Sequence, residues 1–292
     1  MSNPPIELSP NTRFAGVMGW PVDHSLSPAM QNAALKAEKL DVVYVKLPVP
    51  PGHLGEMVVS LEKQNFVGAN VTVPHKVAVL EFMHRLTKEA KLIGAVNTIR
   101  VENDGSLTGH NTDCIGAVKA MEADGTNLRG KVAVILGAGG AGRGVAVGCA
   151  MAGAAKVIVL NRTPEKAQEL VAEMETKEEM RGVRWEARAL DDRSLNWDKV
   201  DAVFQMTSAG MKGIGDSPMD VSQLPKNCHV LEAVYAPLET AFLKAARAKG
   251  LRSTDGLAML LEQGAAAFEF WFARRADRNA MRKALIEATQ RR

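Results

Sequence analysis

A glycine-rich turn is the stretch of this chain with the clearest chemical meaning. The apolar run 132–136 is followed at once by GAGGAG, which has the spacing G-x-G-x-x-G, and then by an expected helix of small residues. The turn consists of Gly137, Ala138, Gly139, Gly140, Ala141 and Gly142. Such a turn lets a pyrophosphate approach the backbone and the free N–H groups of a helix N-terminus. Because a strand precedes the turn and a second strand, 157–160, follows the helix, the pattern predicts a dinucleotide site; the alternative is a turn that only packs a helix close to a sheet.

The residues after that second strand indicate which dinucleotide is bound. Sites for NAD usually carry Asp or Glu at this point, to bond the ribose 2′-hydroxyl. This chain has Asn161, Arg162 and Thr163 instead, with Lys166 one helical turn further on. A guanidinium is planar, permanently charged and suited to a 2′-phosphate, so we predict NADP as the cofactor. Glu165 weakens this argument, and in the alternative interpretation Arg162 is solvated and Thr163 only caps a helix that begins with proline.

The first half of the chain carries polar side chains where predicted strands end. A strand over 13–18 is followed by the sequence HSLSP, and a strand over 66–73 is followed by PHK. Ligands of α/β sheets bind at the carboxyl ends of strands, which makes Ser25 and Lys76 candidates for a site, although a lysine there is usually solvated. Ser27 precedes a proline and is expected to be a helix N-cap, a role that Ser25 does not share.

Two further polar groups lie in the next part of the first half. Residues 77–87 are expected to form a helix, and 95–101 a strand that carries Asn97, whose amide needs partners if it is buried. The sequence GHNTD over 109–113 then precedes a helix that reaches about residue 123. Asp113 is therefore a candidate for chemistry, with helix capping as the alternative role.

The whole chain has the composition of a two-domain α/β protein. It has 292 residues, a net charge of +3 with acidic and basic residues intermixed, and β-α alternation in its second half, which predicts a mostly parallel sheet. We expect a small-molecule substrate and no nucleic-acid partner, because the charge forms no basic patch. Three scattered cysteines and six histidines without ligand spacing predict no disulfide framework and no metal. No signal segment or membrane-length apolar run is apparent, so we expect a cytoplasmic protein without membrane contact.

Several short motifs, taken in their order along the chain, resemble the shikimate dehydrogenase family over nearly the whole sequence. Each motif is weak alone, and their common order makes the resemblance specific. The motifs are HSLSP at 24–28, NVTVPHK at 70–76, GAVNT at 94–98, NTD at 111–113, the 137–142 turn, NRT at 161–163, YAP at 235–237 and the segment from Gly256 to Gly264.

The resemblance implies an α/β protein of two domains. A mixed-sheet substrate domain over 1–114 would be completed by C-terminal helices within 257–292, and a Rossmann-like, doubly wound NADP-binding domain would cover 115–256. The implied reaction is reversible hydride transfer between NADPH and 3-dehydroshikimate, which gives shikimate. The oligomeric state stays open between monomer and homodimer.

The resemblance also assigns roles, position by position. Lys76 and Asp113 would be the catalytic pair. The substrate-binding side chains would be Ser25, Ser27, Asn70, Thr72, Asn97, Tyr235 and Gln263. The cofactor would be held by the turn 137–142, by Asn161, Arg162, Thr163 and Lys166, and by Gly256.

The implied catalytic pair suits the implied chemistry. Hydride addition to a ketone builds negative charge on oxygen, which a positioned ammonium group stabilises and protonates. A free lysine, with a pKa of about 10.4, donates poorly at neutral pH, so a lysine in this role requires tuning by its surroundings. Asp113 would orient Lys76 and hold it charged, or relay the proton; the sequence leaves open which group is the acid–base catalyst.

Some residues depart from the usual pattern of the biosynthetic members. The residues that differ are Trp20, Gln31, Gln205, Glu232 and the pair 272–273. The sequence Met-Gln-Asn at 30–32 is similar to the quinate/shikimate dehydrogenase branch. A paralogue that acts on quinate, an amino-shikimate or a related hydroxylated cyclohexene carboxylate is therefore an alternative. A third hypothesis, from another class, is a non-catalytic metabolite sensor on the same fold.

Overall fold

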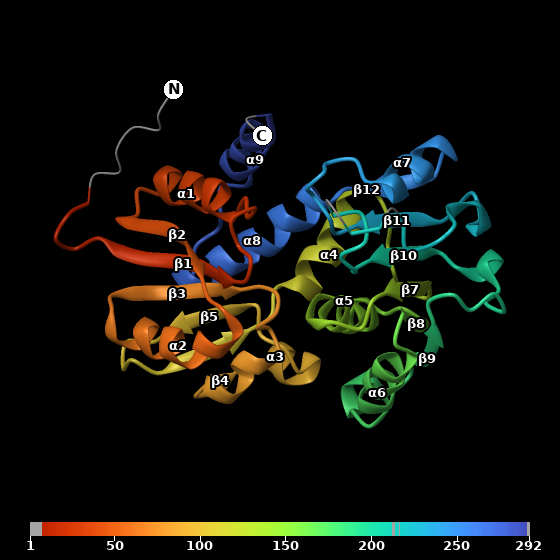
Figure 1. Cartoon of the computed structure of the whole chain (residues 1–292), viewed down its shortest axis with the longest axis horizontal. Helices are drawn as coiled ribbons and strands as arrows, with labels where there is room; N and C mark the ends of the chain where they lie inside the picture. The colour runs from red at the N-terminus through yellow and green to blue at the C-terminus, as the bar shows by residue number, and fades with distance from the viewer. Residues whose placement is uncertain (1–7, 212–213, 216, 291–292) are drawn as a thin grey trace. The chain divides into compact units, whose positions relative to one another are not determined.

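The computed structural model describes residues 8–211, 214–215 and 217–290, and it consists of two compact units (Figure 1). Unit 1 comprises Met1–Thr87, Val96–His110 and Ala267–Arg292, and unit 2 comprises Lys88–Ala95 and Asn111–Ala266. The expected substrate domain was 1–114 completed by 257–292, and of these residues 88–95, 111–114 and 257–266 lie in unit 2 instead. The extreme ends of the expected substrate domain, 1–7 and 291–292, lie outside the described residues.

Unit 1 is built on a mixed sheet, as the resemblance implied. Its strands are β1 (Arg13–Gly19), β2 (Val42–Pro48), β3 (Phe66–Val71), β4 (Arg85–Leu86), β5 (Thr98–Val101) and β6 (Leu107–His110). The strand order is β2-β1-β3-β5-β6-β4. The β1 strand pairs in parallel with β2 and β3, whereas β5 runs antiparallel to both β3 and β6. The start of β5 therefore lies beside the end of β3, which brings Asn97 to the same edge as Asn70.

The helices of unit 1 differ from the expected ones at one place. They are α1 (Ser27–Ala37), α2 (Leu54–Lys63), the last part of α8 (Gly256–Phe272) and α9 (Arg278–Gln290), with single turns η1 (Pro51–His53) and η2 (Ala78–Phe82). The expected helix over 77–87 is wrong, because only η2 forms there before the chain extends into β4. Strand β4 pairs with β6 at Arg85 and Leu86, so tertiary pairing overrides the local helical pattern.

Unit 2 is a doubly wound parallel sheet, which confirms the predicted fold class. Its strands are β7 (Val132–Leu136), β8 (Lys156–Asn161), β9 (Arg184–Ala189), β10 (Ala202–Gln205), β11 (His229–Glu232) and β12 (Arg252–Thr254). The strand order is β12-β11-β10-β7-β8-β9, and every pairing is parallel. The order reverses at β7, the strand that the glycine turn follows, and ligands of such sheets bind at this switch point.

Alternate residues of the central strands face two separate cores. The helices of unit 2 are α3 (Lys88–Ile93), α4 (Asp113–Ala123), α5 (Gly140–Met151), α6 (Pro164–Glu175), α7 (Ala241–Ala248) and the first part of α8, with turns η3 (Glu178–Met180), η4 (Trp197–Lys199) and η5 (Val221–Gln223). Ala133 and Ile135 pack with α4, α5 and α6, whereas Val134 and Leu136 pack with α7 and with apolar residues between 195 and 224.

Helices α4 and α5 approach each other closely because α5 is rich in glycine. A Cβ atom at Gly148 would lie 2.7 Å from the carbonyl oxygen of Cys114, and one at Gly144 would lie 3.1 Å from Cβ of Asp113. The helix that begins at the glycine turn therefore packs directly against the first residues of α4. This contact places Asp113 next to α5.

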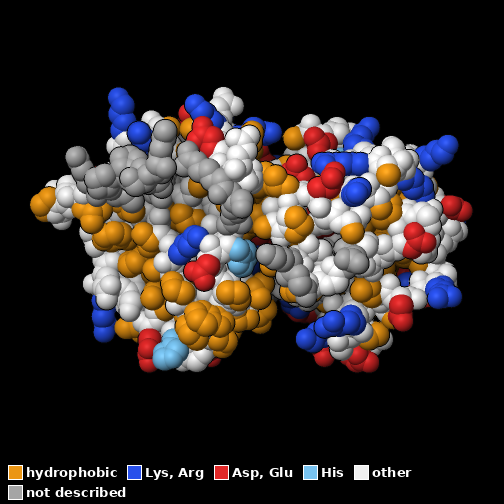
Figure 2. Space-filling model, turned by 45° about the horizontal axis from the view of Figure 1, so that its top comes forward, with side chains coloured by type: hydrophobic (Ala, Val, Ile, Leu, Met, Phe, Trp, Pro, Cys, Tyr) orange, Lys and Arg blue, Asp and Glu red, His pale blue; other side chains and the backbone are white. Residues whose placement is uncertain are grey.

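Charged and apolar side chains share the surface in the pattern that the composition predicts. Figure 2 shows acidic and basic side chains interspersed on the face that it presents, and apolar side chains gathered on one part of that face. The exposed apolar residues include Trp20 and Val73 of unit 1, which are 49% and 68% exposed. The backbone N–H of Trp20 donates to the carbonyl of Val73 over 3.0 Å, so these two side chains belong to neighbouring strand ends.

Glu232 is a fully buried carboxyl group at the end of β11. The N–H of Val234 donates to its Oε1 over 2.8 Å, and the hydroxyl of Thr240 donates to its Oε2 over 2.7 Å. Burial outweighs these hydrogen bonds and raises the pKa of Glu232 to about 7. The group therefore holds its proton more tightly in the folded chain than in the unfolded one.

We expect Glu232 to make stability decrease as the pH rises. Its contribution is complete below the ordinary pKa of 4.5 and is lost as the pH rises through about 7, which removes up to about 3 kcal/mol of unfolding free energy. In the Glu232→Gln variant this part of the pH dependence should disappear. Urea unfolding of both proteins between pH 5 and 8 measures the difference, in which the contributions of other groups cancel. Parallel pH profiles would contradict the assignment.

Candidate active site

In the glycine turn of unit 2, the space beside the central residue Gly139 is open. Gly142 admits no side chain, because its Cβ would lie 1.9 Å from the carbonyl oxygen of Gly137, which itself has φ 108°. By contrast, no atom of the described residues lies within 4 Å of the place where a Cβ at Gly139 would stand. Gly139 is the N-cap of α5, whose first turn carries no acidic residue. The free N–H groups of this helix end, with the positive end of its dipole, suit a phosphate group.

Asn161 connects this turn to the end of β8. Its Oδ1 accepts the N–H of Ala138 over 3.1 Å, and its Nδ2 donates to the carbonyl of Thr163 over 2.9 Å. Thr163 is the N-cap of α6, but its side chain makes no capping hydrogen bond. Arg162 and Lys166 are exposed, and the structure records no ion pair for either of them among the described residues. Asn161 therefore positions the turn, while the two cations remain available to an anionic ligand.

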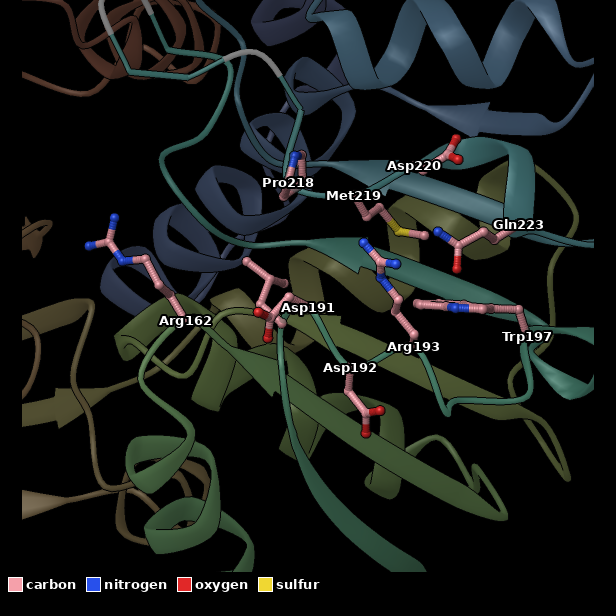
Figure 3. A pocket seen from close by; sticks show the side chains of 10 residues that line it. Arg162, Asp191, Asp192, Arg193, Trp197, Pro218, Met219, Asp220 and Gln223 are labelled. Carbon is pink, nitrogen blue, oxygen red and sulfur yellow. The ribbon is translucent and has the colours of Figure 1, made fainter.

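A pocket of about 390 Å³ opens beside Arg162 (Figure 3). It is lined by side chains that follow β8 and β9 and by the segment that precedes β11: Arg162, Leu190, Asp191, Asp192, Arg193, Trp197, Pro218, Met219, Asp220 and Gln223. In Figure 3 Arg162 stands at one side of the pocket and Trp197 at the other, with Asp191 and Arg193 between them. Trp197 is 9% exposed, and its indole nitrogen has no hydrogen-bond partner among the residues that the structure describes.

The charged residues of this pocket fall into two groups. Asp192 already accepts a hydrogen bond from Arg188 over 2.7 Å, and Asp220 accepts the N–H of Ser222 over 2.8 Å. Arg193, by contrast, has no recorded partner among the described residues. Sequence reasoning identified only Arg162 in this pocket. The others could have been sought where the third strand of the sheet ends, because ligands bind at the carboxyl ends of strands.

Asp113 is held at the start of α4 in unit 2. It is 4% exposed, and its N–H donates to Oδ1 of Asn111 over 3.0 Å. Nδ2 of Asn111 donates in turn to the carbonyl of Ala95 over 3.0 Å. The N-cap of α4 is Thr112, which makes no side-chain capping hydrogen bond, and Asp113 is the first residue of the helix. Asp113 therefore does not have the alternative role of a cap.

Three other predicted residues of unit 2 lie where chain segments meet closely. A Cβ at Gly116 would lie 2.6 Å from Cβ of Gln263, so Gln263 packs directly on α4. A Cβ at Gly256 would lie 2.7 Å from the carbonyl oxygens of Ala233 and Val234, immediately before Tyr235. The structure therefore brings Gln263 to the helix of Asp113, and Gly256 to the segment of Tyr235.

In unit 1 the structure places Ser25 and Ser27 together at the start of α1. Helix α1 begins at Ser27, and Leu26, not Ser27, is its N-cap, without a side-chain capping bond. The predicted capping role of Ser27 is therefore wrong. Instead, Oγ of Ser25 accepts the N–H of Ser27 over 3.3 Å. Both side chains are buried after the end of β1, with 9% and 6% exposure.

Thr72 and Lys76 belong to a turn that is fixed by backbone hydrogen bonds. The N–H of Thr72 donates to the carbonyl of Met18 over 2.9 Å, which attaches this turn to the end of β1. The N–H of Val96 donates to the carbonyl of Lys76 over 2.8 Å, and the buried ring of His75 bonds the carbonyl of Val49. Thr72 and Lys76 themselves are half-buried. The structure thus places the predicted residues of unit 1 around the ends of β1 and β3.

No group of three or more His, Cys, Asp or Glu side chains within 8–211, 214–215 and 217–290 is arranged to hold a metal ion. Over the same residues, no helix combines the length and the apolarity that crossing a membrane requires.

Similarity to known proteins extends over both units. The family models for the shikimate dehydrogenase substrate binding domain, for shikimate/quinate 5-dehydrogenase and for the shikimate 5′-dehydrogenase C-terminal domain match residues 17–99, 119–229 and 256–286. The shikimate dehydrogenase (NADP(+)) of Citrifermentans bemidjiense is 41% identical over 281 residues, which are 95% of this chain and 96% of that protein.

Solved structures are similar over nearly the whole chain. Shikimate 5-dehydrogenase from Thermus thermophilus, in complex with NADP(H) and shikimate, has a TM-score of 0.83 and 36% identity, over 94% of this chain and 99% of its own. The 5-ketofructose reductase of a Gluconobacter strain, without ligand, has a TM-score of 0.85 and 34% identity, over 95% and 99% of the two chains. These matches confirm the resemblance that the motifs indicated: the chain belongs to the shikimate dehydrogenase family.

Proposed function

We propose that this protein is an NADP-dependent shikimate dehydrogenase, an oxidoreductase that interconverts 3-dehydroshikimate and shikimate. The observation that carries the proposal is the open glycine turn beside Arg162, which has no ion-pair partner in the described part of the chain. The relatives of this chain are named shikimate dehydrogenase (NADP(+)). We also propose that it acts in the cytoplasm, since its three cysteines are free and buried, and that it is a monomer or a homodimer.

The residues of unit 2 fit NADP. The N–H groups at the start of α5 face the open side of the turn and would bond the pyrophosphate. Arg162 would bond the 2′-phosphate, with Lys166 as a second charge, and the adenosine would enter the pocket that Leu190 and Met219 line. The chemistry that NADP supplies when bound is hydride donation in one direction and acceptance in the other.

The remaining predicted side chains would hold and protonate the substrate. Ser25 and Ser27 would bond its carboxylate. Its hydroxyl and keto oxygens would be bonded by Asn70, Thr72, Asn97, Tyr235 and Gln263. Lys76 would stabilise the charge that grows on the keto oxygen and deliver the proton, and Asp113 would orient Lys76 or relay that proton.

Initial rates with a panel of substrates and both cofactors test this proposal. We expect reduction of NADP with shikimate to exceed the rate with quinate and the rate with NAD. Quinate turnover comparable to that of shikimate would favour the quinate/shikimate paralogue instead. Binding of shikimate without any NADPH absorbance would favour a metabolite sensor. Because a 5-ketofructose reductase has a similar structure, 5-ketofructose with NADPH belongs in the panel.

Lys76→Ala should lower turnover about 10²-fold or more while shikimate binding changes less, because the variant lacks the proton donor. Steady-state kinetics and calorimetric titration with shikimate measure the two effects. Lys63→Ala is the control, since Lys63 is an exposed lysine at the end of α2 in the same unit. A nearly normal turnover number in Lys76→Ala would remove Lys76 from the mechanism.

Arg162→Ala should raise the KM for NADP about 30-fold and leave the slow reaction with NAD unchanged, because only NADP carries the 2′-phosphate. The dissociation constant of NADPH, followed by its fluorescence, should rise in parallel. Arg184→Ala is the matched control, since Arg184 is exposed at the opposite, N-terminal end of a neighbouring strand. Equal losses with NADP and NAD would show that Arg162 does not recognise the phosphate.

A further inference from the structure

Tyr44 is a buried residue of β2 that no predicted role includes, and its position is determined from three sides. Its backbone N–H donates to Oδ1 of Asn32 over 2.8 Å, and its carbonyl accepts from Nδ2 of Asn32 over 2.9 Å. The ring of Trp271 packs against the phenol ring, with 6.1 Å between the ring centroids. Trp271 is itself anchored by its indole nitrogen, which donates to the carbonyl of Ile99 over 2.8 Å. Tyr44 is 2% exposed, so its hydroxyl needs a partner inside the protein.

That partner is Asn70, a predicted substrate-binding residue. The Tyr44 hydroxyl donates to Oδ1 of Asn70 over 2.7 Å. Nδ2 of Asn70 donates to Oγ1 of Thr98 over 3.0 Å and to the carbonyl of Asn97 over 3.2 Å. The hydroxyl of Thr98 donates in turn to Oδ1 of Asn97 over 2.8 Å. The hydrogen bonds therefore run in one direction from Tyr44 to the side chain of Asn97.

This direction determines the orientation of both amides. The two Nδ2 protons of Asn70 are used within the network, so Asn70 has only a lone pair of Oδ1 to offer a ligand. A reversed Asn70 amide would place Oδ1 against the carbonyl of Asn97, and two acceptors repel each other. In Asn97, a planar amide whose Oδ1 faces Thr98 must direct its Nδ2 to the other side.

We propose that Tyr44 is a positioning residue of the substrate site. It does not contact substrate, and through Asn70 and Thr98 it holds the Asn97 amide in the orientation that bonds a substrate oxygen. This inference rests on the proposed function, because shikimate is the ligand whose hydroxyl or keto oxygen is bound. The network lies at the edge where β3 ends and β5 begins, next to the turn of Thr72 and Lys76.

The network can be broken at either end by variants of almost unchanged shape. Tyr44→Phe removes the first donor, and Thr98→Val removes the link between the two amides. We expect each variant to raise the KM and the calorimetric dissociation constant for shikimate about tenfold, with the KM for NADP unchanged. Thr98→Ser keeps the hydroxyl and should restore both values to within about twofold of the original protein. The double variant should lose less than the product of the single losses, because both changes break one network.

Thr108→Val separates positioning from a general loss of stability. Thr108 is a buried threonine of β6 in the same sheet, and its hydroxyl donates to Glu102, outside this network. The thermal unfolding midpoint of Thr108→Val should fall as much as that of Thr98→Val, while the KM of Thr108→Val for shikimate stays normal. A normal KM in Tyr44→Phe, or equal kinetic losses in Thr108→Val and Thr98→Val, would overturn the inference. The proposed function is tested separately, by measuring whether the original protein binds and oxidises shikimate. If it does not, both the proposed function and this inference are wrong.

Discussion

Unit 2 depends on glycines at the places where two chain segments come into close contact. Gly142 permits the tight turn, Gly148 lets α5 touch α4, and Gly116 lets α4 touch α8 at Gln263. Each contact would be lost if a Cβ were added, because the atom it would meet is backbone, or a Cβ next to it, and cannot rotate away. The glycines of one short helix therefore determine both the proposed phosphate site and the place of Asp113. The proposed binding function and the proposed catalytic function depend on the same packing arrangement.

Unit 1 combines close packing at Gly19 and Gly68 with hydrogen bonds between its buried polar side chains. Its polar residues at the strand ends are buried or half-buried, and their mutual hydrogen bonds limit what each can offer a ligand. Asn70 illustrates this limit, since both protons of its amide are already used by Asn97 and Thr98. Buried polar networks of this kind specify one arrangement, because an alternative leaves a donor or acceptor without a partner. The orientation of side chains therefore determines the proposed substrate site, whereas the clearance around glycines determines the proposed phosphate site.

Local sequence patterns were sufficient to predict the fold class. They were insufficient where contacts between distant segments determine the structure. The turn, the parallel sheet and the position of Arg162 follow from residues that are neighbours in sequence. The helix expected over 77–87 failed because pairing with β6 extends the chain there. Tyr44 gave no signal, since a tyrosine in a strand is usually explained by packing, and its hydroxyl partner lies 26 residues away. The side of the pocket beyond Arg162 was missed for the same reason, because three separate segments build it.

Two residues that depart from the usual family pattern, Gln205 and Glu232, are neighbours with similar structural roles. Gln205 and Glu232 are paired in register on β10 and β11, and both are fully buried. The Gln205 amide bonds Thr207 and Ala209, and Glu232 bonds Val234 and Thr240, so each side chain holds the loop after its own strand. These two residues therefore shape loops and are no argument for a different substrate. Trp20, which is exposed beside Val73, is a departure that these loop contacts do not explain.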